Sequence, residues 1–200
     1  MGRITLAAAL WATCITPGVA AAEYESWENV AVGVSCEVPP GFDVREPGPG
    51  EKAPARAVRL EWENGPYGGL RVLAVRREAR YDSVAVSAGL FQRRLGASAA
   101  FEAEAEVLSP AELAAAGADD GIRAAYALTE GGEGSRLEVM FLSAGDRRYR
   151  VEVSYPSVLE LQLGAAVERI LVTFKILPAA EVAGEDPAEA GGAGDAALSE

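Results

Sequence analysis

Residues 144–161, AGDRRYRVEVSYPSVLEL, contain a turn, a strand pattern and the start of a helix in immediate succession. Gly145-Asp146 is typical of a tight hairpin turn. The strand that follows alternates between two faces, with apolar or aromatic side chains at Tyr149, Val151, Val153 and Tyr155. Polar residues lie between them, so the spacing predicts a strand with one buried face. Pro156 then precedes Ser157 and Glu160, whose spacing predicts a capping box at the start of a helix.

Three arginines of this stretch, Arg147, Arg148 and Arg150, surround a tyrosine in a chain whose formal net charge is −12. They could form a basic site for an anionic partner, or they could be the solvated rim of a hairpin. Acidic residues elsewhere, such as Glu138 or the row Glu102–Glu106, offer them partners, and each exposed pair would contribute about 0.2–1 kcal/mol. We therefore interpret these arginines as the rim of the hairpin.

Strand patterns dominate the rest of the chain. GIRAAYALTE (121–130) and SRLEVMFLS (135–143) are separated by glycines, and together with the opening stretch they predict an antiparallel meander. Further strand patterns are VAVGVSCEV (30–38), AVRLEWEN (57–64), GGLRVLAVRRE (68–78) and FEAEAEV (101–107). The second and third of these predict a hairpin, with Trp62 in the core. ILVTFKIL (170–177) is interpreted as a final buried strand.

Alternation in FEAEAEV predicts that its apolar side chains face inwards: Phe101, Ala103, Ala105 and Val107. The intervening glutamates would face solvent. This acidic row could bind calcium or supply the catalytic carboxylates of a glycosidase. Such a row is more often the solvent-exposed face of a strand, and we interpret these glutamates as such a face.

Helices are predicted at three places between the strands. Asp82 can cap a helix that ends at Gly96, with Val84, Ala88, Phe91 and Leu95 on one stripe. Ser109 and Glu112 have capping-box spacing, with Gly117 as a natural stop. The helix after Ser157 has an apolar face formed by Leu159, Leu163, Ala166, Val167 and Ile170. Helices packed on a largely antiparallel sheet predict an α+β fold.

The sequence resembles the PsbP-like superfamily. VAVGVSCEVPPGFDV (30–44) resembles its opening, in which a strand leads into a P-x-G-[FW] turn. RRYRVEVSYP, the following helix and ILVTFKIL are similar to its end, and GIRAAYALTEG resembles a mid-chain strand. The resemblance covers about residues 27–177. The superfamily includes bacterial DcrB-type periplasmic proteins, photosystem II proteins of plants and cyanobacteria, and a yeast nuclear import factor that binds Ran.

The resemblance implies an α/β/α sandwich around a central antiparallel sheet, with a non-enzymatic role in binding or assembly. The chain contains no histidine, so a metal-handling role that used imidazole does not carry over. The photosynthetic function is not transferred either, because the N-terminus predicts simple export rather than thylakoid transit.

Both ends of the chain predict segments outside the fold. Residues 1–22 have the basic start, apolar run and small-residue end of an export signal, too short to span a membrane. Residues 179–200 carry six acids and no base or aromatic residue, and are predicted to be a disordered acidic tail. One PsbP-like domain at 23–178 is expected, in an extracytoplasmic protein of the periplasm. Residues 39–54, with five prolines, are expected to form an extended loop.

Catalytic and metal chemistry find little support. Without histidine, Ser–His–Asp and Cys–His arrangements are impossible, and neither lysine has the S-x-x-K spacing of a serine–lysine nucleophile pair. Glycine-rich segments match no phosphate-binding loop. Cys36 is interpreted as a buried, inert thiol. We expect no catalytic residues, no metal and no cofactor, and the acidic charge makes nucleic acid an improbable partner.

Three aromatic residues, Trp27, Phe42 and Tyr67, lie outside clean strand patterns and are candidate contacts for a protein partner. The leading hypothesis is an exported, non-enzymatic accessory or assembly factor that binds a protein of the cell envelope. The alternative is a carrier of a small apolar or lipid-like ligand, held in a cavity lined by Phe91, Leu95, Phe141 and Leu163. A carboxylate-based hydrolase is a distant third.

Overall fold

The computed structural model describes residues 23–45, 56–78, 83–96, 99–128 and 134–178, with only the backbone at 99–104. The expected export signal, the acidic tail, Asp82 and part of the proline-rich segment lie outside these residues. Seven strands form one antiparallel sheet in the order β3-β4-β5-β9-β8-β7-β6. Their bounds are β3 Asp43–Arg45, β4 Arg56–Glu61, β5 Arg71–Glu78, β6 Ala99–Val107, β7 Asp120–Leu128, β8 Ser135–Ala144 and β9 Arg147–Pro156.

A second antiparallel sheet contains β1 Glu25–Asn29, β2 Val34–Val38 and β10 Lys175–Ile176, in the order β1-β2-β10. The prediction of one strand over 30–38 was therefore wrong in its first half. Residues 30–33 form the turn of the β1–β2 hairpin, where Val32 N donates to Asn29 Oδ1 at 2.8 Å. The expected strand over 170–177 was also wrong, since only two of its residues pair with β2.

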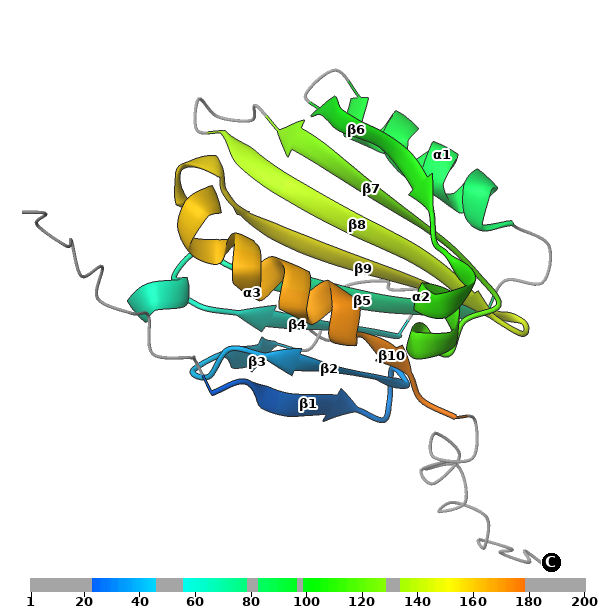
Figure 1. Cartoon of the computed structure of the whole chain (residues 1–200), viewed down its shortest axis with the longest axis horizontal. Helices are drawn as coiled ribbons and strands as arrows, with labels where there is room; N and C mark the ends of the chain where they lie inside the picture. Colours follow the sequence, from blue (N-terminus) through cyan, green and yellow to red (C-terminus); the bar gives the residue numbers. More distant parts are fainter. Residues whose placement is uncertain (1–22, 46–55, 79–82, 97–98, 129–133, 179–200) are drawn as a thin grey trace, which may run out of the picture.

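In the described residues, three helices cover the large sheet on its two faces (Figure 1). They are α1 Val84–Leu95, α2 Pro110–Ala116 and α3 Glu160–Thr173, and short 3-10 turns occupy Gly65–Tyr67 and Ser157–Leu159. α1 lies behind β7 and β8, whereas α2 and α3 lie on the opposite face beside the three-stranded sheet. The prediction of a central antiparallel sheet flanked by helices is confirmed. Across the described ranges, no helix has the length and apolar character needed to cross a membrane.

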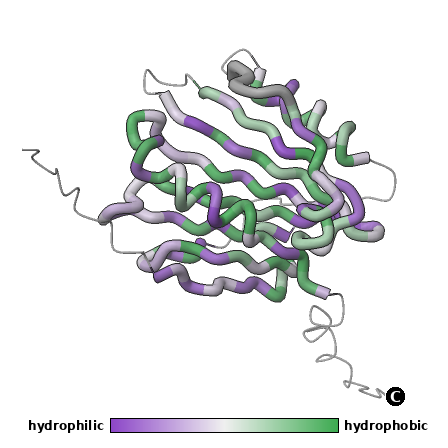
Figure 2. Tube along the Cα trace, in the orientation of Figure 1, coloured by the Kyte–Doolittle hydropathy of each residue, from purple (hydrophilic) through white to green (hydrophobic). Residues whose placement is uncertain are grey.

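Two separate apolar cores hold these layers together. The larger core joins the α3 face of the sheet to α3 and the three-stranded sheet, and it contains Trp27, Cys36, Trp62, Leu163 and Phe174. The smaller core lies under α1 and contains Val84, Phe91, Ala124, Tyr126, Leu137, Val139 and Phe141. Figure 2 shows that hydrophobic and hydrophilic residues alternate along many of the strands. Burying one face on each core fixes the strand register.

Two strand predictions need correction. Residues 43–45, expected within an extended loop, form β3 and pair with β4. In β6, Ala105 and Val107 are exposed instead of inward-facing, and Leu108 is buried. The β6–β7 pairing shifts register twice between Phe101 and Glu106, so strict alternation does not continue along the strand.

Helix starts agree only partly with the capping predictions. α1 is capped by the Ser83 hydroxyl, which accepts from Val86 N. α2 has the predicted capping box, with Ser109 N donating to Glu112 Oε2 at 2.7 Å and Glu112 N donating to Ser109 Oγ at 3.3 Å. The predicted box at Ser157 was wrong, because α3 starts at Glu160 after a 3-10 turn without a side-chain cap.

Ser109→Ala is expected to lower the free energy of unfolding by about 1 kcal/mol, because it removes the oxygen that satisfies the Glu112 N–H. Ser157→Ala is the matched control and is expected to change it by less than about 0.5 kcal/mol. Urea denaturation of both variants measures the difference. Equal losses would contradict the assignment of the two helix starts.

Cys36 is buried in the larger core, and burial, with a smaller contribution from Glu37, raises its pKa to about 12. Thiolate is the reactive form. At pH 8 the native protein is therefore expected to react with iodoacetamide at Cys36 far more slowly than the urea-unfolded protein. Mass spectrometry of the Cys36 peptide measures both rates. Similar rates would show that the thiol is accessible in the folded chain.

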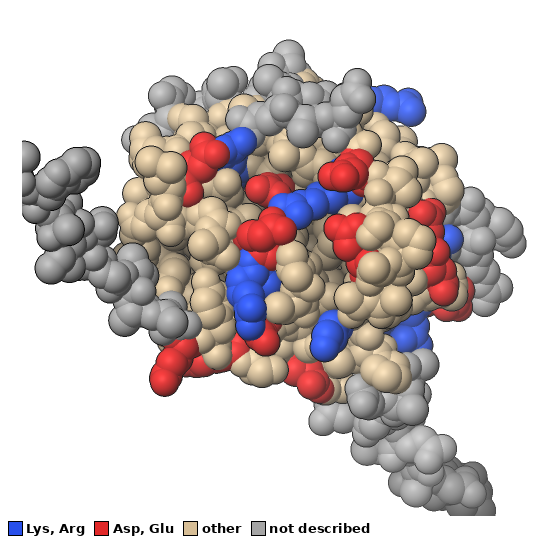
Figure 3. All heavy atoms as spheres, viewed as in Figure 1, with Lys and Arg blue, Asp and Glu red and all other residues tan. Residues whose placement is uncertain are grey.

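Acidic and basic groups are interspersed on the face that carries α3 (Figure 3). Arg123 of β7 lies between two carboxylates, and its Nη2 is 2.7 Å from Glu138 Oε2 and 2.7 Å from Glu168 Oε2. Burial opposes the charge on Arg123, but its bonds to Glu168 and Glu138 outweigh burial and raise its pKa. Charges on this face are thus largely paired with each other.

Candidate functional site

A pocket of about 90 Å³ lies between α1 and the face of the sheet formed by β5, β8 and β9. It combines four arginines with an apolar lining. Its residues are Val75, Arg77, Ser87, Leu90, Phe91, Arg94, Phe141, Arg148, Tyr149 and Arg150. We call it the arginine pocket.

Strand register brings the arginines together. Arg77 of β5 is the Cα partner of Arg148 of β9, and Val75 is the partner of Arg150. Cross-strand partners share a face of the sheet. Because Tyr149 is buried in the larger core, Arg148 and Arg150 lie on the face that carries α1. Arg94, in the last turn of α1, completes the group.

The arginines differ in how their charges are balanced. Arg150 lies over the Phe91 ring, 5.0 Å from its centroid, and its Nε is 2.6 Å from Glu152 Oε1. Arg148 donates to the carbonyl oxygens of Gly145 and Arg147 at 3.1 Å. Among the described side chains, no carboxylate lies within 4.0 Å of a guanidinium nitrogen of Arg77 or Arg94.

Electrostatics at the pocket oppose further positive charge. Burial, followed by the nearby Arg150 and Arg94, lowers the pKa of Arg77. Burial also raises the pKa of Glu152, although Arg150 and Arg59 partly counteract it. Like charges that face one another destabilise a sheet. An anion in the pocket would relieve this repulsion.

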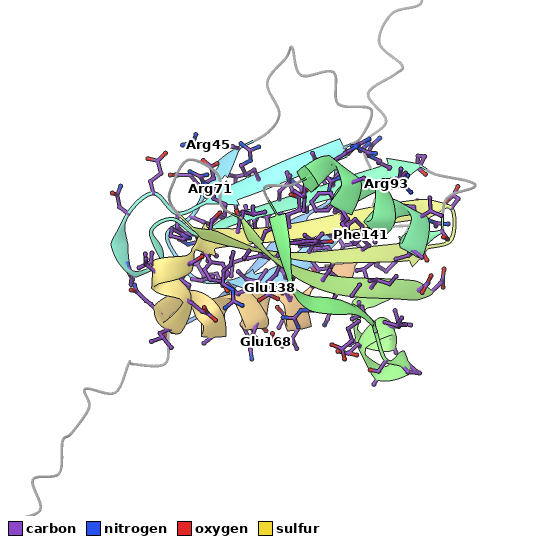
Figure 4. All side chains as sticks on the ribbon, turned by 90° about the horizontal axis from the view of Figure 1, so that it is seen from above. Arg45, Arg71, Arg93, Glu138, Phe141 and Glu168 are labelled. Carbon is purple, nitrogen blue, oxygen red and sulfur yellow. The ribbon has the colours of Figure 1, made fainter. Side chains whose placement is uncertain are left out.

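More arginines lie on the same face beyond the pocket. Arg45, Arg59 and Arg71 occupy β3, β4 and the start of β5, and all three approach Glu61. Figure 4 shows Arg45, Arg71 and Arg93 on the side that carries α1, whereas Glu138 and Glu168 lie towards α3. We call this surface the basic face; it comprises Arg45, Arg59, Arg71, Arg77, Arg94, Arg148 and Arg150, with Asp43, Glu61, Glu63 and Glu152 among them.

Arg148 lies beside the β8–β9 turn as the hairpin interpretation predicts, but the expected pairing of these arginines with Glu138 was wrong. Glu138 lies on the opposite face, where it binds Arg123. Of the Glu102–Glu106 row, only Glu106 has a described side chain; it is exposed, and Glu102 and Glu104 lie outside the described side chains. The signal that could have identified the site is the repeated basic pairing at Arg76-Arg77, Arg93-Arg94 and Arg147-Arg148.

The cavity expected for an apolar ligand is not formed by the four residues proposed for it. Phe91, Leu95 and Phe141 pack in or against the smaller core. Leu163 is buried in the larger core, on the other side of the sheet. A different apolar pocket, of about 240 Å³, lies between α2 and α3. Its lining includes Leu108, Ala115, Met140, Leu171 and Phe174.

The three candidate partner contacts do not form one exposed patch. Trp27 is only 9 % exposed and belongs to the larger core. Phe42 and Tyr67 are half-buried at the margin of that core. The Phe42 ring lies 5.6 Å from the Trp62 ring, and the predicted burial of Trp62 is confirmed. In the described part of the chain, no three acidic or thiol side chains converge as metal ligands would.

The fold is similar to that of several solved structures, three of which are described below. Cyanobacterial PsbP (CyanoP) of Synechocystis sp. PCC 6803 matches with a TM-score of 0.58 and 10% identity, over 80% of this chain and 95% of that one. The Ran-binding protein Mog1p of Saccharomyces cerevisiae matches with a TM-score of 0.51 and 8% identity, over 79% and 97%. A mutant of Mog1 matches with a TM-score of 0.52 and 11% identity, over 80% of this chain and 99% of that one.

At these identities the similarity establishes the fold, and the chain has the PsbP-like fold that its sequence predicts. No protein-family model matches the sequence. No curated protein sequence matches it either.

Proposed function

We propose that this chain is an exported, non-enzymatic domain that binds a protein partner and serves as an accessory or assembly factor of the cell envelope. The arginine pocket is the observation that carries the proposal. Four arginines and an apolar lining converge there in a chain of net charge −12. An acidic chain that gathers arginines on one face has a surface suited to an anionic partner.

The chemistry of the pocket favours binding over catalysis. Arginine remains protonated in proteins, so it neither accepts nor releases a proton as a catalytic acid or base must. Its planar guanidinium recognises carboxylates through paired hydrogen bonds. Arginine and aromatic side chains are also the residues that contribute most energy at protein interfaces.

The size of the pocket supports a protein partner rather than a lipid. Ligand sites for small molecules commonly have volumes of about 300–1,000 Å³. The arginine pocket, at about 90 Å³, accommodates one side chain. The Ran-binding name of Mog1p is compatible with protein recognition by this fold. Export rests on the signal pattern at residues 1–22.

The pocket between α2 and α3 supports carriage of a small apolar ligand as a second candidate function. Its lining is largely apolar and its volume is about 240 Å³. Glu112 and Arg123 are its charged residues. A ligand held there would be smaller than a typical lipid.

Cross-linking in the native envelope, followed by affinity capture and mass spectrometry of proteins and lipids, tests the proposal. We expect one protein to be captured reproducibly and in constant proportion to the chain, without bound lipid. Stoichiometric lipid or another apolar molecule, with no captured protein, would favour the carrier function. Recovery of neither would overturn the protein-binding proposal.

A further inference from the structure

We propose that the arginine pocket is the docking site for an acidic segment of the partner protein, in which a glutamate or aspartate adjoins a large apolar residue. The carboxylate would lie between Arg77 and Arg94, and the apolar side chain would contact Leu90 of α1. This inference rests on the proposed protein-binding function and specifies the surface and the partner chemistry.

Charge is the first reason for this assignment. Arg77 and Arg148 face each other across β5 and β9, and Arg94 and Arg150 line the same pocket. Within the described part of the chain, neither Arg77 nor Arg94 has a carboxylate within ion-pair distance. A carboxylate placed between them would gain charge-assisted hydrogen bonds and offset the burial and the repulsion from Arg150 and Arg94 that lower the pKa of Arg77.

Apolar surface is the second reason. Leu90 lines the pocket yet is 43 % exposed, although the adjoining Phe91 and Phe141 are buried. The Arg150 guanidinium lies over the Phe91 ring. A free inorganic anion would leave the Leu90 surface in water, whereas an apolar side chain beside the carboxylate would cover it.

The basic face explains why the partner is an acidic segment rather than a single group. Arg45, Arg59 and Arg71 lie near Glu61, and Arg45 also pairs with Glu63, so these three arginines are paired with only two carboxylates. An acidic chain that leaves the pocket across β5 and β4 would meet these arginines in turn (Figure 4). Charge of this kind accelerates association and selects for acidic partners.

Titration with a defined peptide tests the site directly. The probe is acetyl-Glu-Glu-Phe-Glu-Glu-amide, added to the purified protein while NMR records the arginine Nε–H signals. We expect the signals of Arg77 and Arg94 to shift most. The peptide with Gln in place of Glu, and the peptide with Ala in place of Phe, should each bind at least about tenfold more weakly.

Charge-matched variants separate the pocket from net charge. Arg77→Glu with Arg94→Glu is expected to weaken peptide binding by about tenfold or more. The control is Arg93→Glu with Arg147→Glu, which changes the same charge at neighbouring positions that do not line the pocket. Leu90→Ala should weaken binding, whereas Val86→Ala, on the same helix and 49 % exposed, should not. Circular dichroism confirms folding of each variant.

Several results would overturn the inference. They are equal binding of the Gln or Ala peptide, equal effects of the two charge-reversed pairs, and binding of inorganic phosphate or single-stranded DNA in place of the peptide.

Envelope cross-linking distinguishes failure of the docking site from failure of the proposed function. If the Arg77→Glu, Arg94→Glu protein captures the partner as well as the unaltered protein does, the pocket is not the docking site but protein binding stands. If the unaltered protein captures no partner, the proposed function itself fails.

Discussion

Trp62→Ala is expected to lower the free energy of unfolding by about 3–5 kcal/mol, a large share of the stability of a domain of this size. Trp62 follows β4 and is almost fully buried in the larger core. Its indole Nε1 is 3.3 Å from the carbonyl oxygen of Pro39 and 3.2 Å from that of Pro40, so it connects this segment to the sheet. Removing the ring would leave a cavity and deprive both carbonyls of a donor.

Urea denaturation at neutral pH measures this loss, and an unchanged dependence on urea would show that unfolding remains two-state. Val44→Ala, on the adjacent strand β3, is the exposed control and should change stability by less than about 0.5 kcal/mol. Trp62→Phe should fall between the two, because it keeps an aromatic ring but not the N–H. If Trp62→Ala costs no more than Val44→Ala, Trp62 does not contribute to the core as described.

Local patterns predicted most of the large sheet because side chains along its strands alternate between two faces, and at least one face of each meander strand packs on a core. Tyr149, Val151 and Val153 are buried as their alternation requires. The same rule failed at residues 170–173, where a run of branched residues indicated a strand. There the buried positions Ile170, Leu171 and Phe174 continue the helical spacing from Leu163, so packing against the sheet determined a helix.

The arginine pocket could not be predicted in the same way, because it depends on contacts between distant segments. β5 pairs with β9 across about seventy residues of sequence. α1, which lies between these two strands in the sequence, packs on the same sheet. A local pattern shows that Arg77 and Arg148 each face away from the larger core. It does not show that they are cross-strand partners, nor that Arg94 joins them.

The net charge of the whole chain does not describe the local charge of the pocket. The value of −12 is a sum over the whole chain, including the six acids of residues 179–200, which lie outside the described residues. Electrostatic attraction at a contact depends on charges within roughly 10 Å at ordinary ionic strength. The pocket is lined by Arg77, Arg94, Arg148 and Arg150, so its local charge is opposite in sign to the net charge of the chain.

Leu163→Ala is expected to lower the free energy of unfolding by about 2–5 kcal/mol. Leu163 is 0 % exposed and lies on the face of α3 that packs against β2 and β9. Most helical stability in a protein comes from such packing. We expect α3 to depend on it strongly, because α3 starts without a side-chain cap. The shortened side chain would leave a cavity between the helix and the sheet, and neighbouring residues fixed in the sheet could fill it only in part.

Leu161→Ala provides the control within the same helix. It removes the same atoms two residues earlier, where the side chain is 104 % exposed, and should change stability by less than about 0.5 kcal/mol. Because both substitutions have the same effect on helix propensity, the difference between them isolates the burial of Leu163. Urea denaturation of the two variants measures that difference. Similar losses would mean that α3 does not present this face to the sheet, and the larger core would have to be reassigned.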